Sequence, residues 1–159
     1  MSAIFRLDRT RAALFDAAGR CFDATERRWL AAPTIVSDAV EALDAIAAVT
    51  WLQRESGAWL RIPIGVIGPG EATAAQLAAA LEVGELLGDC RLTVICGGRQ
   101  GVMQAVCEGV ARVGGLALGR QFGKLVIGLE GAADLEGVHH VDTAREAVTR
   151  VAEESLGVT

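Results

Sequence analysis

Two stretches of the chain, IGVIGPG at residues 64–70 and TVICGGRQG at residues 93–101, each run from β-branched residues into a glycine-rich turn. A helical pattern follows each turn, so the pair predicts two consecutive strand-turn-helix units, as in a βαβ crossover. Parallel strands deliver both turns to one edge of a sheet, where backbone N–H groups and helix N-termini face the same space. We therefore expect an anion-binding site, of the kind that holds a phosphate, at these turns.

The rest of this region also follows an α/β pattern. Thr73 and Gln76 form a capping box for a helix that ends at Gly88, and a second helix is expected from Met103 to about Val113. Residues 116–122 fit either a strand or a helix end, and the pattern leaves both open. A buried strand at 125–129 and a terminal helix, which starts at a second capping box at 143–146, complete the predicted α/β core.

The N-terminal part predicts a β-hairpin followed by a helix. Short strands are expected at 3–7, 13–15 and 21–22, with the reversal at 16–19. The helix is expected to be capped by Ser37, to end at Gly57, and to carry on one face Val40, Leu43, Ala47 and Trp51. The predicted organisation is one compact domain, with an N-terminal hairpin and helix extension at 1–61 and a ligand-binding core at 62–159.

Composition argues against a membrane partner and for a cytoplasmic location. The hydrophobic fraction of 52% rests largely on alanine, and no apolar run reaches the length of a membrane span. The N-terminal residues lack the pattern of a secretory signal. The four cysteines show no metal-ligand spacing and are expected to be reduced thiols in the core, although Cys96 precedes a glycine turn and could touch a ligand. Abundant alanine, with arginine in place of lysine except at Lys124, suggests a GC-rich bacterial genome.

Charge argues against a nucleic-acid partner. The net charge is −5, and it arises from residues 63–159, because the basic and acidic side chains of residues 1–62 balance. An acidic module repels a polyanion and lacks the basic stripe of a DNA- or RNA-binding protein. One small phosphorylated ligand remains compatible with this field, because backbone dipoles and a single arginine can hold it. Arg99 could fork onto such a phosphate, and a solvated loop arginine is the alternative.

The individual motifs point to binding more clearly than to catalysis. GPGEAT at 68–73 half-matches the dinucleotide fingerprint, but Thr73 stands at its third glycine, and no P-loop sequence is present. Tight strand-to-helix turns are the alternative explanation of the glycines. No serine lies in a nucleophile elbow, and Glu71 has no partner carboxylate. His139 and His140 are neighbours that point apart, so we expect loop histidines, no metal site and no catalytic residue.

The segments 64–68 and 94–103, with the helix that ends at Gly114-Gly115, resemble the LOG-like (lysine-decarboxylase-like, DprA/Smf-related) Rossmann families. The most similar branch includes molybdenum-cofactor carrier proteins, and the similarity resumes at 116–131. The resemblance implies a Rossmann-like three-layer sandwich with a mainly parallel sheet. It also implies that the two glycine turns bind the phosphate of the ligand, through Gly68, Gly98 and Gly101, with Arg99 as a further candidate.

Relatives in these families carry a further block with another core strand and a PGGxGTxxE-type motif, and this chain lacks that block. The glutamate of the motif is catalytic in the phosphoribohydrolase members, so no residue here inherits its role. The comparison places a deletion junction at Gly115-Leu116 and implies a shortened sandwich. The first core strand then loses a neighbour, and its edge must be covered by the Leu125 strand, the hairpin or another subunit. We therefore expect a homo-oligomer, a dimer or larger.

These observations favour a protein that binds or carries a phosphorylated small molecule, with molybdenum cofactor or a nucleotide as the candidate ligands. Two alternatives stay open: a degenerate or structural protein without a ligand, and a nucleoside-monophosphate phosphoribohydrolase. The predicted ligand-binding residues are Gly68, Pro69, Gly70, Gly97, Gly98, Arg99, Gly101 and Met103.

Overall fold

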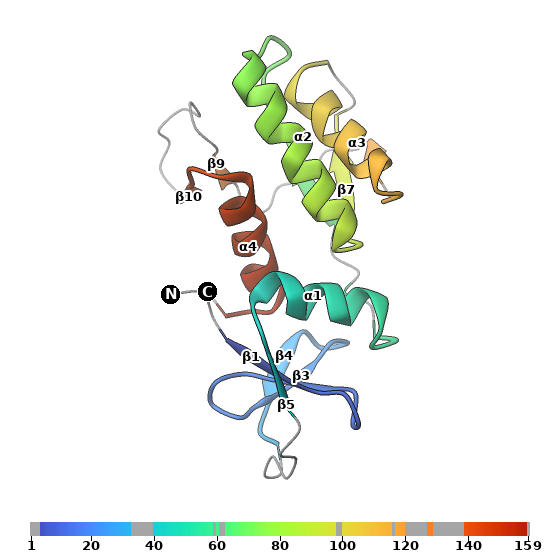
Figure 1. Cartoon of the computed structure of the whole chain (residues 1–159), viewed down its shortest axis with the longest axis vertical. Coiled ribbons are helices and arrows are strands. Elements are labelled where there is room, and N and C mark those ends of the chain that lie inside the picture. Colours follow the sequence, from blue (N-terminus) through green and yellow to red (C-terminus); the bar gives the residue numbers. More distant parts are fainter. Residues whose placement is uncertain are drawn as a thin grey trace. The chain divides into compact units, whose positions relative to one another are not determined.

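The computed structural model divides the chain into two compact units (Figure 1), which are described separately. The first unit comprises Met1–Leu60 and Ala152–Thr159, and the second comprises Arg61–Val151. The structure describes residues 4–32, 40–58, 60, 63–97, 100–115, 117–119, 127–128 and 139–158, and at 117–119, 127–128 and 139 it describes the backbone alone.

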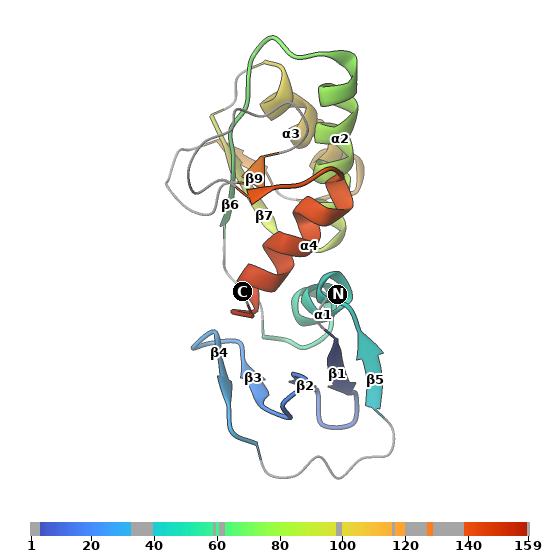
Figure 2. The ribbon, with the colours of Figure 1, turned by 90° about the vertical axis from the view of Figure 1, so that its left-hand side faces the viewer.

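The first unit contains a five-stranded antiparallel sheet in the order β4-β3-β2-β1-β5 (Figure 2). Leu7 pairs with Leu14 across β1 and β2, and Phe5 pairs with Leu43 across β1 and β5. The predicted hairpin is therefore part of a larger sheet. Its strands are β1 (Phe5–Asp8), β2 (Ala13–Phe15), β3 (Cys21–Asp23), β4 (Arg28–Leu30) and β5 (Val40–Leu43).

The predicted N-terminal boundary of the following helix was wrong. Helix α1 spans Ala45–Arg54, and its cap is Asp44, whose side chain accepts a hydrogen bond from the Ala47 N–H at 2.8 Å. Val40 and Leu43, which were expected on the helix face, lie in β5 instead. Pairing with β1 outweighs the helical spacing of these residues, and a carboxylate cap then starts the helix one residue after the strand. Ser37, the expected cap, lies outside the described residues.

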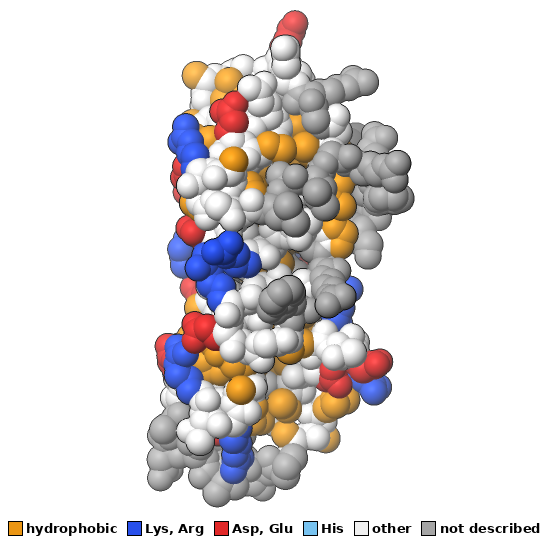
Figure 3. Space-filling model, turned by 90° about the vertical axis from the view of Figure 1, so that its right-hand side faces the viewer, with side chains coloured by type: hydrophobic (Ala, Val, Ile, Leu, Met, Phe, Trp, Pro, Cys, Tyr) orange, Lys and Arg blue, Asp and Glu red, His pale blue; other side chains and the backbone are white. Residues whose placement is uncertain are grey.

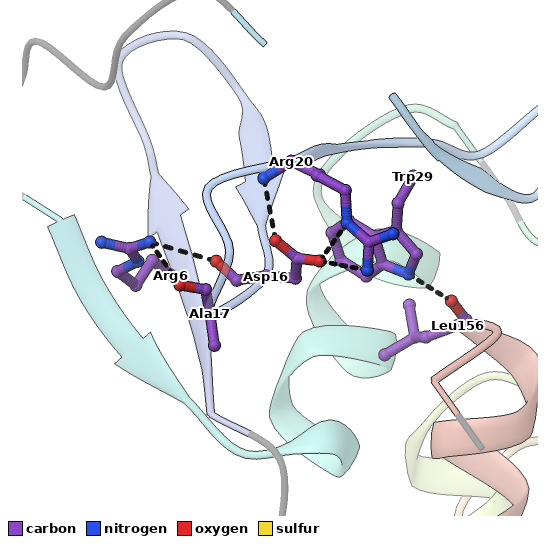
Figure 4. Close-up of polar contacts among 6 residues, drawn as sticks. All are labelled: Arg6, Asp16, Ala17, Arg20, Trp29 and Leu156. Carbon is purple, nitrogen blue, oxygen red and sulfur yellow. Dashed lines mark hydrogen bonds and ion pairs between the residues drawn. The ribbon is translucent and has the colours of Figure 1, made fainter. Parts of the chain in front are cut away.

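Asp16 organises the turn between β2 and β3 (Figure 4). Its carboxylate accepts hydrogen bonds from the backbone N–H of Arg20 at 2.8 Å and from Arg20 Nε at 2.7 Å. Arg6 donates from Nη2 to the Asp16 carbonyl oxygen at 3.1 Å. Gly19 completes the turn with a φ of 79°, a conformation that glycine adopts without strain. The predicted reversal at 16–19 is thus confirmed.

The core of the first unit joins this sheet to α1 and to the end of the chain. Trp29 lies against Phe5, with ring centroids 5.8 Å apart, and against Phe22, with centroids 4.9 Å apart. Its Nε1 donates a hydrogen bond to the carbonyl oxygen of Leu156 at 2.7 Å (Figure 4). Leu156 is fully buried. A single tryptophan therefore anchors the C-terminal residues to the sheet.

Replacing this tryptophan by phenylalanine should isolate the contribution of its hydrogen bond. Trp29→Phe keeps an aromatic ring against Phe5 but leaves the Leu156 carbonyl without its donor, so we expect a loss of about 1 to 2 kcal/mol in the free energy of unfolding. Urea unfolding followed by circular dichroism measures this loss. Trp29→Ala should cost more, about 3 kcal/mol or beyond, because it also removes the ring. Equal stability of Trp29→Phe and the unmodified protein would contradict the role of the hydrogen bond.

The second unit contains the two predicted strand-turn-helix units. Strands β6, β7 and β8 form a parallel sheet in that order, with Ile64 opposite Val94 and Ile95 opposite Leu118. Strands β9 and β10 form a separate parallel pair. The elements are β6 (Pro63–Val66), α2 (Ala74–Asp89), β7 (Thr93–Cys96), α3 (Val102–Arg112), β8 (Ala117–Gly119), β9 (Ile127–Gly128), β10 (His139–His140) and the first part of α4 (Ala144–Ser155), whose residues from Ala152 onward belong to the first unit.

The chain is therefore a mixed α/β protein, in which a five-stranded antiparallel sheet accompanies smaller parallel sheets. The described residues do not show the expected three-layer sandwich with a mainly parallel sheet. The choice left open at 116–122 is decided in part, because 117–119 form a strand beside β7. Of the strand expected at 125–129, residues 127–128 are β9, and its other residues lie outside the described part.

Glycines allow α2 and α3 to pack closely, side by side (Figures 1 and 2). A Cβ built on Gly84 would overlap the carbonyl oxygen of Val106 and would lie 3.0 Å from the Cα of Gly109. A Cβ built on Gly109 would in turn overlap the carbonyl oxygen of Leu81. Backbone thus meets backbone at this crossing, and both glycines are buried. The crossing holds the two helices that follow the glycine turns.

The predicted starts of two helices are confirmed by their caps. Thr73 Oγ1 accepts from the Gln76 N–H at 3.2 Å, and the Gln76 side chain accepts from the Thr73 N–H at 3.0 Å. At α4, Thr143 Oγ1 accepts from the Glu146 N–H at 3.1 Å, and the Glu146 carboxylate accepts from the Thr143 N–H at 3.2 Å.

Among the described residues, no helix has the length and apolar character needed to cross a membrane.

Candidate phosphate-binding turns

The first turn leaves β6 at its carboxyl end and leads to α2. Ile67, directly after the strand, is 70% exposed. Pro69 and Gly70 are also exposed, while Gly68 is half-buried. The helix then begins with Thr73 as its cap. The backbone of this turn is therefore open to solvent on the side that Pro69 and Gly70 occupy.

The second turn leaves β7 after Cys96 and leads to α3. Gly97 and Gln100 are exposed, and Gly101 is the residue before the helix. Two of the predicted ligand-binding residues, Gly98 and Arg99, lie outside the described residues. The structure therefore places both ends of this turn, at the end of β7 and at the start of α3.

The two turns lie against each other. The backbone N–H of Val102 donates a hydrogen bond to the carbonyl oxygen of Pro69 at 3.2 Å. A Cβ on Gly68 would come within 2.6 Å of the Val102 side chain. Gly101, with a φ of +80°, faces the carbonyl oxygens of Pro69 and Gly70, and a Cβ there would overlap both. The close contact between turns thus explains why Gly68 and Gly101 are glycines, with or without a ligand.

The two helix N-termini differ in how their N–H groups are used. At α2 the capping box uses the N–H groups of Thr73 and Gln76, and the Thr73 side chain caps the helix. At α3 the cap position is Gly101, and no side chain of the described residues caps the helix. The Val102 N–H is bonded to the first turn, so the N–H groups that follow it in the first turn of α3 are the candidate donors for an anion. Because Gly101 has no side chain to cap the helix, the geometry favours the start of α3 over a symmetric site between both helices.

Gly70 and Gly97 have a different environment from the two packed glycines. The nearest atom to a Cβ on Gly70 is the Gln100 carbonyl oxygen at 4.0 Å, and the nearest to a Cβ on Gly97 is the Met103 sulfur at 3.6 Å. Neither position needs glycine to fold, and both residues are exposed. Their backbones are therefore accessible to a ligand. Met103 is 7% exposed, and its side chain packs next to Gly97.

Cys96 and Cys107, which flank the second turn in the sequence, form a pair of thiols that was not predicted from the sequence. Cys96 Sγ and Cys107 Sγ are 3.1 Å apart and share a hydrogen bond. Burial raises the pKa of Cys107 to about 11, and the hydrogen bond with Cys96 acts in the same direction. Cys96 ends a strand that leads into a turn, and Cys107 lies one helical turn beyond Met103. The spacing of Cys107 from Met103, on the same face of the helix, was the sequence signal that could have predicted the contact with Cys96.

Two polar residues that the sequence pointed to, His139 and His140, lie in the second unit. His139 and His140, expected in a loop, form β10 and pair with Ile127 and Gly128 of β9. No group of three or more His, Cys, Asp or Glu side chains within the described part could hold a metal ion. On the face shown in Figure 3, basic and acidic side chains are intermixed.

The second unit thus has consecutive parallel βα units whose glycine turns meet at the carboxyl ends of β6 and β7. A model of the SLOG cluster4 family matches residues 61–122, a segment that includes both turns and both helices. This match supports a relationship to the SLOG superfamily, whose members are Rossmann-like. No curated protein and no solved structure matches the chain.

Proposed function

We propose that the second unit binds a phosphorylated small molecule at the start of α3. The supporting observation is that α3 begins at Gly101 without a side-chain cap, next to the exposed backbone of Gly70 and Gly97. An uncapped helix N-terminus carries about half a positive charge and presents N–H donors, the combination that phosphate requires. Binding here needs no catalytic side chain.

The candidate ligands are molybdenum cofactor and nucleotides, and the function is to bind or carry them. The proposal of molybdenum cofactor rests on the resemblance of the turns to the carrier branch of the LOG-like and DprA/Smf-related families. The match to the SLOG cluster4 family supports a relationship at the superfamily level alone. Both ligands contain a phosphate, which is the group that the turns would hold.

Alanine substitutions at the two accessible glycines test the proposal without disturbing the fold. Gly70→Ala and Gly97→Ala place a methyl group where a phosphate would approach, and the structure has room for that group. We expect each to weaken binding of AMP by about tenfold or more, since the loss of one charged hydrogen bond costs about 1.5 to 3 kcal/mol. Isothermal titration calorimetry of the unmodified protein and both variants measures this change.

Adenosine is the matched control ligand, because it keeps the base and sugar but lacks the phosphate. It should bind far more weakly than AMP, and the unfolding temperatures of the ligand-free variants should equal that of the unmodified protein. A molybdopterin-loaded sample tests the second candidate ligand in the same way. Failure of every phosphorylated ligand to bind or to raise the unfolding temperature would overturn the proposal.

A structural role without a ligand is the second candidate. It is favoured by the packing of Gly68 and Gly101, which contact between the turns explains without a phosphate. Unchanged stability across phosphorylated ligands would support it. A nucleoside-monophosphate phosphoribohydrolase remains the third candidate, but the chain lacks the PGGxGTxxE-type motif whose glutamate is catalytic in those members. Release of free adenine from AMP at a rate above the uncatalysed one would support that candidate.

We further propose that the second unit is a shortened Rossmann-like domain, mainly parallel in its sheet, in a bacterial cytoplasmic homo-oligomer. Strand β6 lies at one end of the described three-stranded sheet, and Ile67 beside it is 70% exposed. An exposed strand edge favours association with a further strand or a second copy. Native mass spectrometry gives the number of subunits, and a monomer at micromolar concentration would overturn the oligomer. Small phosphorylated ligands, and neither nucleic acid nor membrane, are the proposed partners.

A further inference from the structure

Cys96 and Cys107 form a contact between β7 and α3 that the proposed ligand binding does not use. The two Sγ atoms are 3.1 Å apart, so a shift of about 1 Å would bring them to the length of a disulfide bond. Both thiols are free in the structure. The residues are close in space because the strand, the turn and the first part of the helix return the chain onto itself.

The two thiols differ in access to solvent. Cys96 is 3% exposed, whereas Cys107 is half-buried. An oxidant from solution therefore reaches Cys107 first, and Cys96 lies behind it at hydrogen-bonding distance. This order is the arrangement of an attacking thiol and a resolving thiol.

We propose that Cys96 and Cys107 are a redox modification site, which forms an intramolecular disulfide by exchange with a low-molecular-weight disulfide. The Cys107 thiolate attacks one sulfur of the small disulfide and releases one thiolate, giving a mixed disulfide. The Cys96 thiolate then attacks the Cys107 sulfur and releases the second. The two cysteine protons go to the two released thiolates, so two protein thiols lose two electrons and one small disulfide becomes two thiols.

The ionisation of Cys107 sets the pH dependence of this exchange. Its raised pKa, to about 11, leaves a small thiolate fraction near neutral pH. The fraction that can attack grows with pH until the pKa is reached, so the rate of disulfide formation should rise by about tenfold per pH unit between about pH 7 and pH 9. A thiol with an ordinary pKa would approach its maximal rate within this range.

Oxidation would enclose the second glycine turn in a covalent ring. Residues 97–106 lie between the two cysteines, and they include Gly97, Gly101 and the start of α3. The new bond would tie the end of β7 to the second turn of α3. The chemistry itself depends on the two thiols and stands whether or not the turns bind a phosphate.

The test is oxidation of the full chain with excess oxidised glutathione at about pH 9, followed by mass spectrometry under non-reducing conditions. We expect an intact mass lower by about 2 Da, the loss of two hydrogens, and a proteolytic fragment that joins Cys96 to Cys107. The number of thiols alkylated under denaturing conditions should fall by two, and reduction should restore it.

Cys107→Ser should abolish the internal disulfide, and Cys96→Ser should leave a stable mixed disulfide of glutathione at Cys107. The matched control, Cys21→Ser with Cys90→Ala, should still form the bond at the rate of the unmodified protein. The central result does not depend on whether the variants fold, because the fragment that joins Cys96 to Cys107 is measured on the unmodified chain. In the unmodified protein, a stable mixed disulfide at Cys107, a disulfide between chains through Cys96 or Cys107, or no reaction of these two thiols would each overturn the proposal.

Discussion

Gly84→Val should destabilise the second unit by about 3 kcal/mol or more. The Cβ would overlap the Val106 carbonyl oxygen and crowd the Cα of Gly109, so α2 and α3 would have to separate. Overpacking of flexible side chains costs about 1 to 3 kcal/mol, and rigid backbone relaxes less readily. Urea unfolding monitored by far-ultraviolet circular dichroism measures the shift.

Ala78→Val is the matched control, because it introduces the same side chain at an exposed position of the same helix. It should cost only a few tenths of a kcal/mol, from the lower helix propensity of valine. For Gly84→Ala, the sign of the stability change is the test. Helix propensity alone predicts a gain of about 0.5 to 1 kcal/mol, whereas the backbone contact predicts a loss. A stabilised Gly84→Ala variant would contradict the close helix crossing.

Gly101→Ala should both destabilise the fold and remove ligand binding. Gly101 combines a φ of 80° with a ψ of −134°, a region that is essentially restricted to glycine. A Cβ would also overlap the carbonyl oxygens of Pro69 and Gly70. We expect a cost of about 2 to 4 kcal/mol, because strain and overlap act together. Thermal unfolding gives the stability change, and calorimetry with AMP gives the affinity.

Gly114→Ala serves to compare backbone strain with steric overlap. Gly114 has a φ of +69°, and nothing lies within 4 Å of a Cβ built there. This variant therefore reports backbone strain without overlap, and about 1 kcal/mol is expected. The excess cost of Gly101→Ala over Gly114→Ala measures the contact between the two glycine turns together with the added strain of the Gly101 backbone conformation. Equal costs would show that the turns do not press on each other as the structure has them.

Comparison of the glycine pairs shows which part of the site could be predicted from the sequence. The positions of both turns, at 68–70 and 97–101, follow from strand runs and helix starts that lie within a few residues of each other. The roles of single glycines do not follow. Gly68 and Gly101 face atoms of the opposite turn, while Gly70 and Gly97 have room for a side chain. A sequence pattern cannot distinguish these environments, because the neighbouring atoms come from distant positions.

In the N-terminal part, too, a contact between distant residues could not be predicted from the local sequence pattern. Val40 and Leu43 have helical spacing with Ala47, but their pairing with β1 places them in a strand. Asp44 then caps α1 in place of Ser37. Strand pairing is a contact over more than thirty residues of chain, so local spacing could not reveal it.

The sequence by itself determined the local elements of the second unit: the strands at 63–66 and 93–96, the turns after them, and the capped starts of α2 and α4. These signals depend on residues within about four positions of each other, and their energies are local. Only the tertiary structure decided that the turns touch and that Cys96 meets Cys107. Each of these facts depends on atoms that folding brings together from separate elements, where packing and hydrogen bonding are determined by the three-dimensional path of the chain.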